Sequence, residues 1–213
     1  MASARRLVSG FYLVSRLQNE LDWAIARSYR SQGNPELAAR YFERAINGLE
    51  LTEDRTQLGL AHLAAATVLM DDERLDQAEK HLDRAEQMLS CSSELAHATG
   101  ERARLALLNG DHAQARSLAQ QALARLEHVN GRADETGRAW TTLAEVYAAL
   151  QQHELADTAF RTAISKLAKR APARTLAYAY QAYAAYLETR GRPSDALDAL
   201  KHAADLLNTP GGQ

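Results

Sequence analysis

Apolar side chains recur at helical spacing between residues 140 and 164, and the rest of the chain repeats this arrangement. The first stripe has a large aromatic, an aliphatic and a small residue at i, i+3 and i+4, with a further aromatic one turn later: Trp140, Leu143, Ala144 and Tyr147. A polar break follows, and a second stripe has the same period: Ala156, Phe160, Ala163 and Ile164. This spacing places each stripe on one face of a helix. Because the small residues allow close packing and the aromatics fill the remaining space, the pattern predicts a pair of packed helices.

The order of these residues resembles the tetratricopeptide repeat, whose pattern is W-x2-L-G-x2-Y followed by A-x3-F. The resemblance covers nearly everything between residues 18 and 207. It implies an all-α fold, a right-handed α-solenoid of about five antiparallel helix pairs. It also implies a non-catalytic protein that binds a protein or peptide segment.

Five units follow when the chain is aligned on one alanine of the second helix, which we call the reference alanine: Ala38, Ala78, Ala115, Ala156 and Ala196. The steps are 40, 37, 41 and 40 residues, compared with about 34 in the usual unit. Helices roughly one turn longer would contain the extra residues. The expected repeats are 18–51, 52–91, 92–130, 131–171 and 172–208, with residues 1–17 extending the first helix. We expect residues 1–213 to form one continuous domain, because no unit buries its apolar faces alone.

Two features of the repeats carry local predictions. Glycine stands at three of the polar breaks, where it would end a helix: Gly33, Gly110 and Gly191. The third unit departs most from the pattern, because three of its positions have lost the expected side chain: Arg102, Ala106 and Ala119. Closer helix contact or a local irregularity is expected there.

Composition restricts the class of protein. The chain is 46% hydrophobic and 24% charged, and its net charge of −2 gives no global attraction to nucleic acid or to an anionic membrane. A single cysteine, Cys91, cannot form an internal disulfide, which favours a reducing, cytoplasmic location. No run of 18 apolar residues is present, so a membrane-spanning helix is not expected.

The first 19 residues allow two interpretations. They contain arginine but no acid, and Leu7, Phe11 and Val14 share one face, as in a mitochondrial transit peptide. The interpretation that we favour is an extended first helix, because the same apolar series continues into the first repeat.

Candidate chemistry is sparse. The seven histidines do not pair with each other or with Cys91 at helical metal-ligand spacing, and we expect scattered surface histidines and no metal site. No glycine-rich phosphate loop and no nucleophile motif is present, so we expect neither an enzyme nor a cofactor. One basic cluster suits a helix end better than a nucleic-acid interface: Lys166, Lys169, Arg170 and Arg174.

The resemblance implies a binding groove on the concave side, lined by the first helix of each pair. Carried over residue by residue, the main groove positions are Trp23, Arg27, Arg30, Leu63, Thr67, Arg104, Arg138, Thr141, Glu145, Tyr178, Gln181 and Glu188. Arginines at one part of the groove and glutamates at another favour a partner segment with acidic residues toward one end. The family's clamp for a peptide carboxylate uses Lys and Asn, and asparagine is missing at these positions. The alternative is that these residues are ordinary solvated helix surface.

The chain ends predict a homodimer. In the last helix, one stripe is assigned to its own pair: Leu197, Leu200, Ala204 and Leu207. Apolar residues on the other flank and at the opposite end of the chain are then candidates for the interface: Leu7, Phe11, Val14, Ala199, Ala203 and Leu206.

The leading hypothesis is therefore a protein- or peptide-binding adaptor. Units of about 40 residues resemble those of bacterial regulators, so a sensor or regulatory part of such a protein is one form of it. The alternatives are a self-assembling structural scaffold and an organelle-targeted assembly factor.

Overall fold

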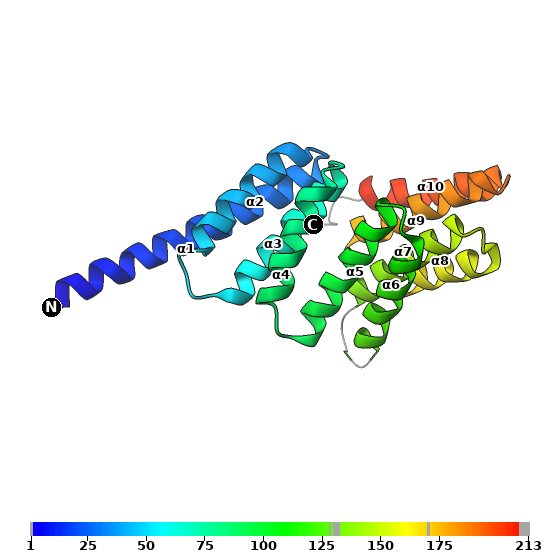
Figure 1. Cartoon of the computed structure of the whole chain (residues 1–213). Coiled ribbons are helices and arrows are strands. Elements are labelled where there is room, and N and C mark those ends of the chain that lie inside the picture. Colours follow the sequence, from blue (N-terminus) through cyan, green and yellow to red (C-terminus); the bar gives the residue numbers. More distant parts are fainter. Residues whose placement is uncertain (1, 128, 130–132, 170, 209–213) are drawn as a thin grey trace. The chain divides into compact units, whose positions relative to one another are not determined.

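The structure is a computed structural model that describes residues 2–127, 129, 133–169 and 171–208, with side chains from residue 17 onward. These residues form ten α-helices in consecutive antiparallel pairs (Figure 1): α1 (Ala2–Ser31), α2 (Pro35–Leu49), α3 (Arg55–Asp71), α4 (Leu75–Met88), α5 (Ser92–Leu108), α6 (His112–Leu126), α7 (Ala133–Ala149), α8 (His153–Leu167), α9 (Ala173–Thr189) and α10 (Pro193–Asn208). The predicted all-α fold of five helix pairs is confirmed. Within the described part of the chain, no helix has the length and apolar character needed to cross a membrane.

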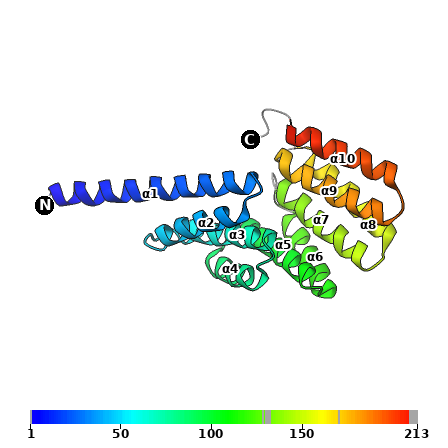
Figure 2. The same cartoon turned by 90° about the horizontal axis from the view of Figure 1, so that it is seen from above.

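The helices group into two compact units, Met1–Glu101 and Arg102–Gln213, and the division falls within α5. In the first unit, α2 packs against both α1 and α3, and α3 packs against α4. Helix α1 is twice as long as α2, with 30 residues against 15, and its N-terminal half projects beyond α2 (Figure 1). In the second unit, α7 packs against α6 and α8, while α9 contacts α7, α8 and α10 (Figure 2).

The turn inside each pair uses one left-handed residue, always five positions before the reference alanine. These residues have φ between 58° and 78°: Gly33, Glu73, Gly110, Gln151 and Gly191. The left-handed conformation lets the next backbone N–H return to the preceding helix, as when Asn34 N–H donates to the Tyr29 carbonyl at 3.0 Å. The predicted role of the three glycines as helix ends is confirmed. Glu73 and Gln151 adopt the same conformation at a higher steric cost.

The core is formed by the stripes that the sequence predicts. All five reference alanines are buried, with 0–1% exposure. Four residues further on, the next position of the stripe is also 0–1% exposed in the first four repeats: Phe42, Leu82, Ala119 and Phe160. The Phe160 ring lies 5.2 Å from that of Tyr183 and 5.4 Å from that of Tyr186, so it packs between α8 and the following first helix. Trp140 and Tyr147 are half-buried beside it.

Glycine allows the two helices of a pair to approach closely in the second and fourth repeats. A Cβ atom added to Gly137 on α7 would lie 2.2 Å from Cγ of Leu167 on α8. A Cβ atom added to Gly59 on α3 would lie 2.9 Å from Cδ2 of Leu89, next to α4. Since neither leucine could keep its position against a larger residue, these glycines set the distance between the paired helices.

The predicted orientation of α10 is wrong. Ala199 and Ala203, which we had assigned to a dimer interface, are 6% and 2% exposed, and Ala199 belongs to the same core cluster as residues of α9. Leu197 and Leu200, which we had assigned to the helix pair, are 53% and 40% exposed. Alanines on the contact face allow α10 to approach α9 closely, as in the other pairs, and this turns the leucines outward. The interface candidates Leu7, Phe11 and Val14 lie outside the residues whose side chains the structure describes.

Two histidines are packed together in the first unit, contrary to the expectation of scattered surface histidines. His62 on α3 is 1% exposed, and its Nδ1 lies 2.9 Å from Nδ1 of His81 on α4. His81 Nε2 lies 3.1 Å from Oε1 of Glu43 on α2. Burial lowers the pKa of His62 to about 4, and the nearby charges of His81 and Arg84 act in the same direction, against that of Glu43. His62 is therefore neutral at pH 7 and links three helices through its neighbour.

We predict that Phe160→Ala destabilises the second unit by about 3–5 kcal/mol, because it empties a fully buried site between helices. The chain has two tryptophans, one in each unit, so Trp140 fluorescence in a Trp23→Phe background reports the denaturant midpoint of the second unit alone. Leu155→Ala is the matched control, since Leu155 is 50% exposed on the same helix. Equal midpoints for the two variants would contradict the assigned packing.

We predict that the first unit loses stability in acid through His62. Between pH 6.5 and 4 the unfolded state binds a proton at His62 and the folded state does not, so the free energy of unfolding falls as pH falls. The total loss is about 3 kcal/mol, at about 1.4 kcal/mol per pH unit. His62→Asn, which does not titrate, should show a flatter slope in Trp23 fluorescence in a Trp140→Phe background. His202→Asn, a change at an exposed histidine of the second unit, should leave the slope of the first unit unchanged.

Candidate binding face on the first helices

Three residues predicted to line the groove are buried instead. Leu63, Thr67 and Thr141 have 2–3% exposure. The Thr67 hydroxyl donates to the Leu63 carbonyl and the Thr141 hydroxyl to the Gly137 carbonyl, both at 3.0 Å. Because the polar atoms of both threonines are satisfied inside their own helices, all three residues are packing residues and not ligand contacts.

In the first unit, the other predicted positions remain at least partly accessible. Arg27 is exposed on α1. Arg30 is half-buried, with its Nε 3.3 Å from Oδ2 of Asp71 at the end of α3. Trp23 is also half-buried, and its ring meets the Phe42 ring edge-on with 5.7 Å between centroids. Trp23 is therefore in part a core residue of the first pair.

In the second unit, three predicted residues from three different first helices come together. Arg104 on α5 has its guanidinium carbon 6.0 Å from the centre of the Tyr178 ring on α9. The Tyr178 hydroxyl donates to Oε1 of Glu145 on α7 at 3.2 Å. We call these residues the α5–α7–α9 cluster. Of the remaining positions, Arg138 is half-buried, while Gln181 and Glu188 are exposed.

The cluster has unusual electrostatics for its position at a surface. Tyr178 is 41% exposed, but Glu145 beneath it is half-buried. Burial raises the pKa of the Glu145 carboxyl to about 7, and this effect outweighs the opposing charge of Arg104 and the hydrogen bond from Tyr178. Near neutral pH, Glu145 is thus poised between its neutral and charged forms, and a ligand that offers a cation or a hydrogen-bond donor would favour the charged form.

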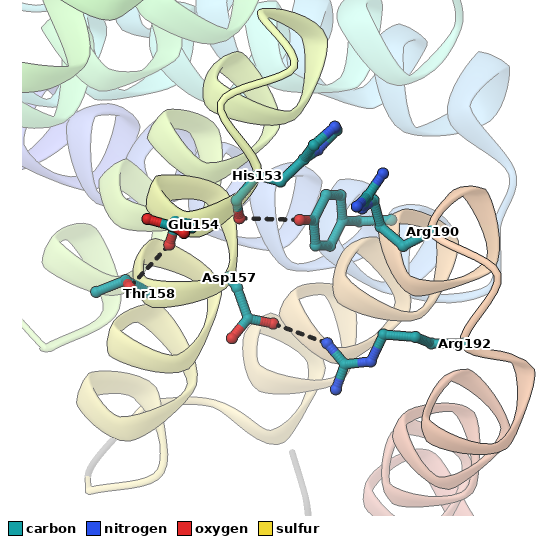
Figure 3. Close-up of a pocket in the computed structure, with 7 residues that line it drawn as sticks. His153, Glu154, Asp157, Thr158, Arg190 and Arg192 are labelled. Carbon is teal, nitrogen blue, oxygen red and sulfur yellow. Dashed lines mark hydrogen bonds and ion pairs between the residues drawn. The ribbon is translucent and has the colours of Figure 1, made fainter.

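A second feature, which the sequence did not suggest as a site, is a pocket of about 420 Å³ where α8, α9 and the start of α10 meet (Figure 3). It is lined by His153, Glu154, Asp157, Thr158, Tyr186, Arg190 and Arg192. Arg192 lies on the Asp157 side of the pocket and Arg190 on the His153 side (Figure 3). The Tyr186 hydroxyl donates to the main-chain carbonyl of His153 at 2.9 Å.

Asp157 is the centre of a polar network at this pocket. Arg192 Nη1 lies 3.2 Å from Oδ1 of Asp157 and Arg161 Nε lies 2.8 Å from its Oδ2. The Tyr183 hydroxyl donates to Oδ1 at 2.6 Å, and burial together with this hydrogen bond raises the pKa of Tyr183. Arg192 also pairs with Asp195 at 2.6 Å. These contacts join α8, α9 and α10, so the network accounts for the pocket as a structural junction.

Sequence reasoning missed this network because its members stand in three different helices. The arginine-rich break between α9 and α10 supplies two of the pocket residues, Arg190 and Arg192. Among the described residues, no group of three or more His, Cys, Asp and Glu side chains is placed to hold a metal ion.

We predict that Glu145→Gln becomes more stable relative to the wild type as pH rises. Between pH 4.5 and 7 the folded carboxyl keeps a proton that the unfolded one has lost, so the wild type loses stability as pH rises. Glutamine keeps an oxygen for the Tyr178 hydroxyl but does not titrate. The free energy of unfolding of Glu145→Gln relative to the wild type should rise by at most about 1.4 kcal/mol per pH unit. Trp140 fluorescence in a Trp23→Phe background measures this difference, and the exposed Glu188→Gln is the control. Parallel pH profiles for both variants would contradict the prediction.

The sequence matches a family model in two places. Residues 23–47 and 137–165 match the model of the tetratricopeptide repeat. These segments fall in the first and fourth repeats, and the second match contains the stretch with the most regular pattern. No curated protein matches the chain.

The structure is similar to several solved repeat structures. One is a putative kinesin light chain from Podosopora anserina with nearly identical TPR-like repeats, 19% identical, with a TM-score of 0.58 and coverage of 90% of this chain and 94% of that one. Another is BtubC from P. vanneervenii, 15% identical, with a TM-score of 0.64 and coverage of 100% and 88%. A third is a Rap protein complexed with Competence and Sporulation Factor, 19% identical, with a TM-score of 0.66; the match covers 89% of this chain but only 58% of Rap. At these identities the likeness is one of fold. Two segments of the chain therefore match the tetratricopeptide repeat, and the structure has the fold of solved proteins that are built from such repeats.

Proposed function

We propose that the chain is a non-catalytic adaptor that binds a protein or peptide segment through the face formed by the first helices of its second unit. The α5–α7–α9 cluster is the observation that carries this proposal. Three consecutive first helices each contribute one functional side chain to it: Arg104, Glu145 and Tyr178. Arginine and tyrosine dominate the binding energy of protein interfaces, and here they stand next to a carboxyl of adjustable charge.

The partner that suits this face is a segment with acidic residues toward one end, bound extended or as a short helix. Its carboxylates would meet Arg104 and Arg138, which stand on consecutive first helices. Its other end would offer hydrogen-bond donors or a cation to Glu188, which is exposed on α9, while Glu145 lies close to Arg104 within the cluster. Opposite charges on the two parts of the face would fix the direction in which the segment binds.

The comparisons support a binding role at the level of the fold. The Rap structure contains a bound factor, which favours the form of the proposal in which this chain senses or regulates. A scaffold that binds partners without catalysis is also the general role of tetratricopeptide-repeat proteins, to which the matched segments point.

The test is partner capture with a charge-reversed face. Proteins captured by the wild type are identified by mass spectrometry, and the affinity of each purified partner is then measured by fluorescence anisotropy. Arg104→Glu with Arg138→Glu should weaken binding at least about tenfold, and wild-type affinity should fall as salt rises. The control is Arg40→Glu with Arg116→Glu, which makes the same charge change on exposed positions of second helices. Circular dichroism first shows that both variants are folded; equal affinities for the two variants would exclude this face.

A further inference from the structure

Exposed apolar side chains form a stripe on α1 and another on α10, outside the α5–α7–α9 cluster. On α1, Leu17 and Leu21 are 56% and 53% exposed, and Ile25 continues the same face. On α10, Leu197 and Leu200 are 53% and 40% exposed. Leucines exposed to this extent at neighbouring positions of one helix face are a mark of an interaction surface.

The junctions between consecutive repeats show what such stripes do inside the chain. At the α8–α9 junction, Phe160 packs on Tyr183 and Tyr186, while the Tyr183 hydroxyl donates to Asp157. The Tyr186 hydroxyl reaches the carbonyl of His153, so later residues of α9 meet earlier residues of α8 and the two helices are antiparallel.

The α6–α7 junction uses the same positions. There, Ala119 clusters with Leu143, and Ala115 with Val146. Relative to the reference alanines, Ala119 corresponds to Phe160, while Leu143 and Val146 correspond to Tyr183 and Tyr186. The chain thus has a standard junction between a second helix and the following first helix.

The exposed stripes occupy the two sides of this standard junction. Leu200 stands at the repeat position of Phe160, and the residues at this position in the four earlier repeats are 0–1% exposed. Leu21 stands at a repeat position that every later repeat fills with a buried alanine of 0–3% exposure: Ala61, Ala98, Ala139 and Ala179. Each stripe is therefore one half of a junction whose other half is present elsewhere in the sequence.

At the two end stripes, the large and the small side chain stand on the opposite sides from those that they occupy at most internal junctions. The antiparallel register places Ile164 of α8 level with Ala179 of α9, a large residue against a small one. The corresponding pairs Ile46–Ala61 and Leu123–Ala139 have the same order, and the remaining junction, between α4 and α5, has Glu86 with Ala98. At the end stripes the order is reversed, because the small residue is Ala204 on α10 and the large one is Leu21 on α1.

The end stripes also differ in polarity from the α8–α9 junction. The internal pair of Asp157 and Tyr183 is joined by a hydrogen bond. At the end stripes the corresponding residues are Leu197 on α10 and Ile25 on α1, and both are apolar. A leucine opposite isoleucine leaves no polar atom unpaired, whereas Leu197 opposite Tyr183, or Ile25 opposite Asp157, would leave a hydroxyl or a carboxyl without its partner.

We propose that the chain associates head to tail with a second copy, with α1 of one copy docked on α10 of the next in the geometry of an internal junction. Leu200 and Leu197 of one copy then pack against Ile25 of the other, and Ala204 receives Leu21. Such an interface joins two different surfaces, so it forms rings when the rotation closes and open chains when it does not. This assembly goes beyond the proposed binding function, since it uses residues outside the α5–α7–α9 cluster.

The experiment is complementation between two end variants, measured by sedimentation over a wide concentration range. Leu21→Glu removes the α1 stripe and Leu200→Glu removes the α10 stripe; both residues are exposed, and circular dichroism checks that each variant is folded. Leu155→Glu, a change at an exposed leucine outside both stripes, is the matched control. The wild type and the control should assemble further as concentration rises, while each end variant should stay at the 23.4 kDa of one chain.

The decisive sample is the equal mixture of the two end variants. Each retains the half that the other lacks, so the mixture should form a 1:1 complex of twice 23.4 kDa and nothing larger. A wild type that stays monomeric throughout would overturn the proposal, as would a mixture that stays monomeric. Loss of assembly in only one variant would also overturn it, because that result belongs to a symmetric contact of α1 with α1 or of α10 with α10.

Discussion

Close approach of neighbouring helices is the constraint on which the structure depends. Each second helix presents a fully buried reference alanine to its pair, and glycine allows a still closer contact where Gly137 meets Leu167. Burial of a small side chain contributes little by itself, but it brings larger side chains within contact distance on either side. Phe160 uses this space, since it reaches the rings of the next first helix.

The same close approach lets polar groups of neighbouring helices meet in two places. His62 is buried between helices and meets His81, and Asp157 is surrounded by two arginines and a tyrosine. A buried polar atom without a partner costs about 1–3 kcal/mol. At His62 Nδ1 and at Asp157, a residue of a neighbouring helix supplies the partner. These contacts make the junctions specific in a way that alanine and leucine alone do not.

Binding and assembly make separate demands on this architecture. The α5–α7–α9 cluster needs first helices from three consecutive repeats, because Arg104, Glu145 and Tyr178 stand on three different helices. Its residues therefore depend on the spacing that the alanine contacts set, although they contribute little to the core. The stripes on α1 and α10 depend on the same spacing, since they correspond to the surfaces that meet at the α6–α7 and α8–α9 junctions.

Periodicity in the sequence determined the ten helices, the left-handed turn glycines and the burial of the reference alanines, because these follow from contacts within one turn or one pair. The resemblance to the tetratricopeptide repeat, and not periodicity alone, placed Arg104, Glu145 and Tyr178 among the expected groove residues. Only the tertiary structure decided which flank of α10 faces α9, because both flanks are apolar and alanine permits the closer approach. It likewise decided the burial of Leu63, Thr67 and Thr141, the pairing of His62 with His81, and the network at Asp157. Those features depend on which neighbouring helix covers each face, and a repeating pattern of residues does not contain that information.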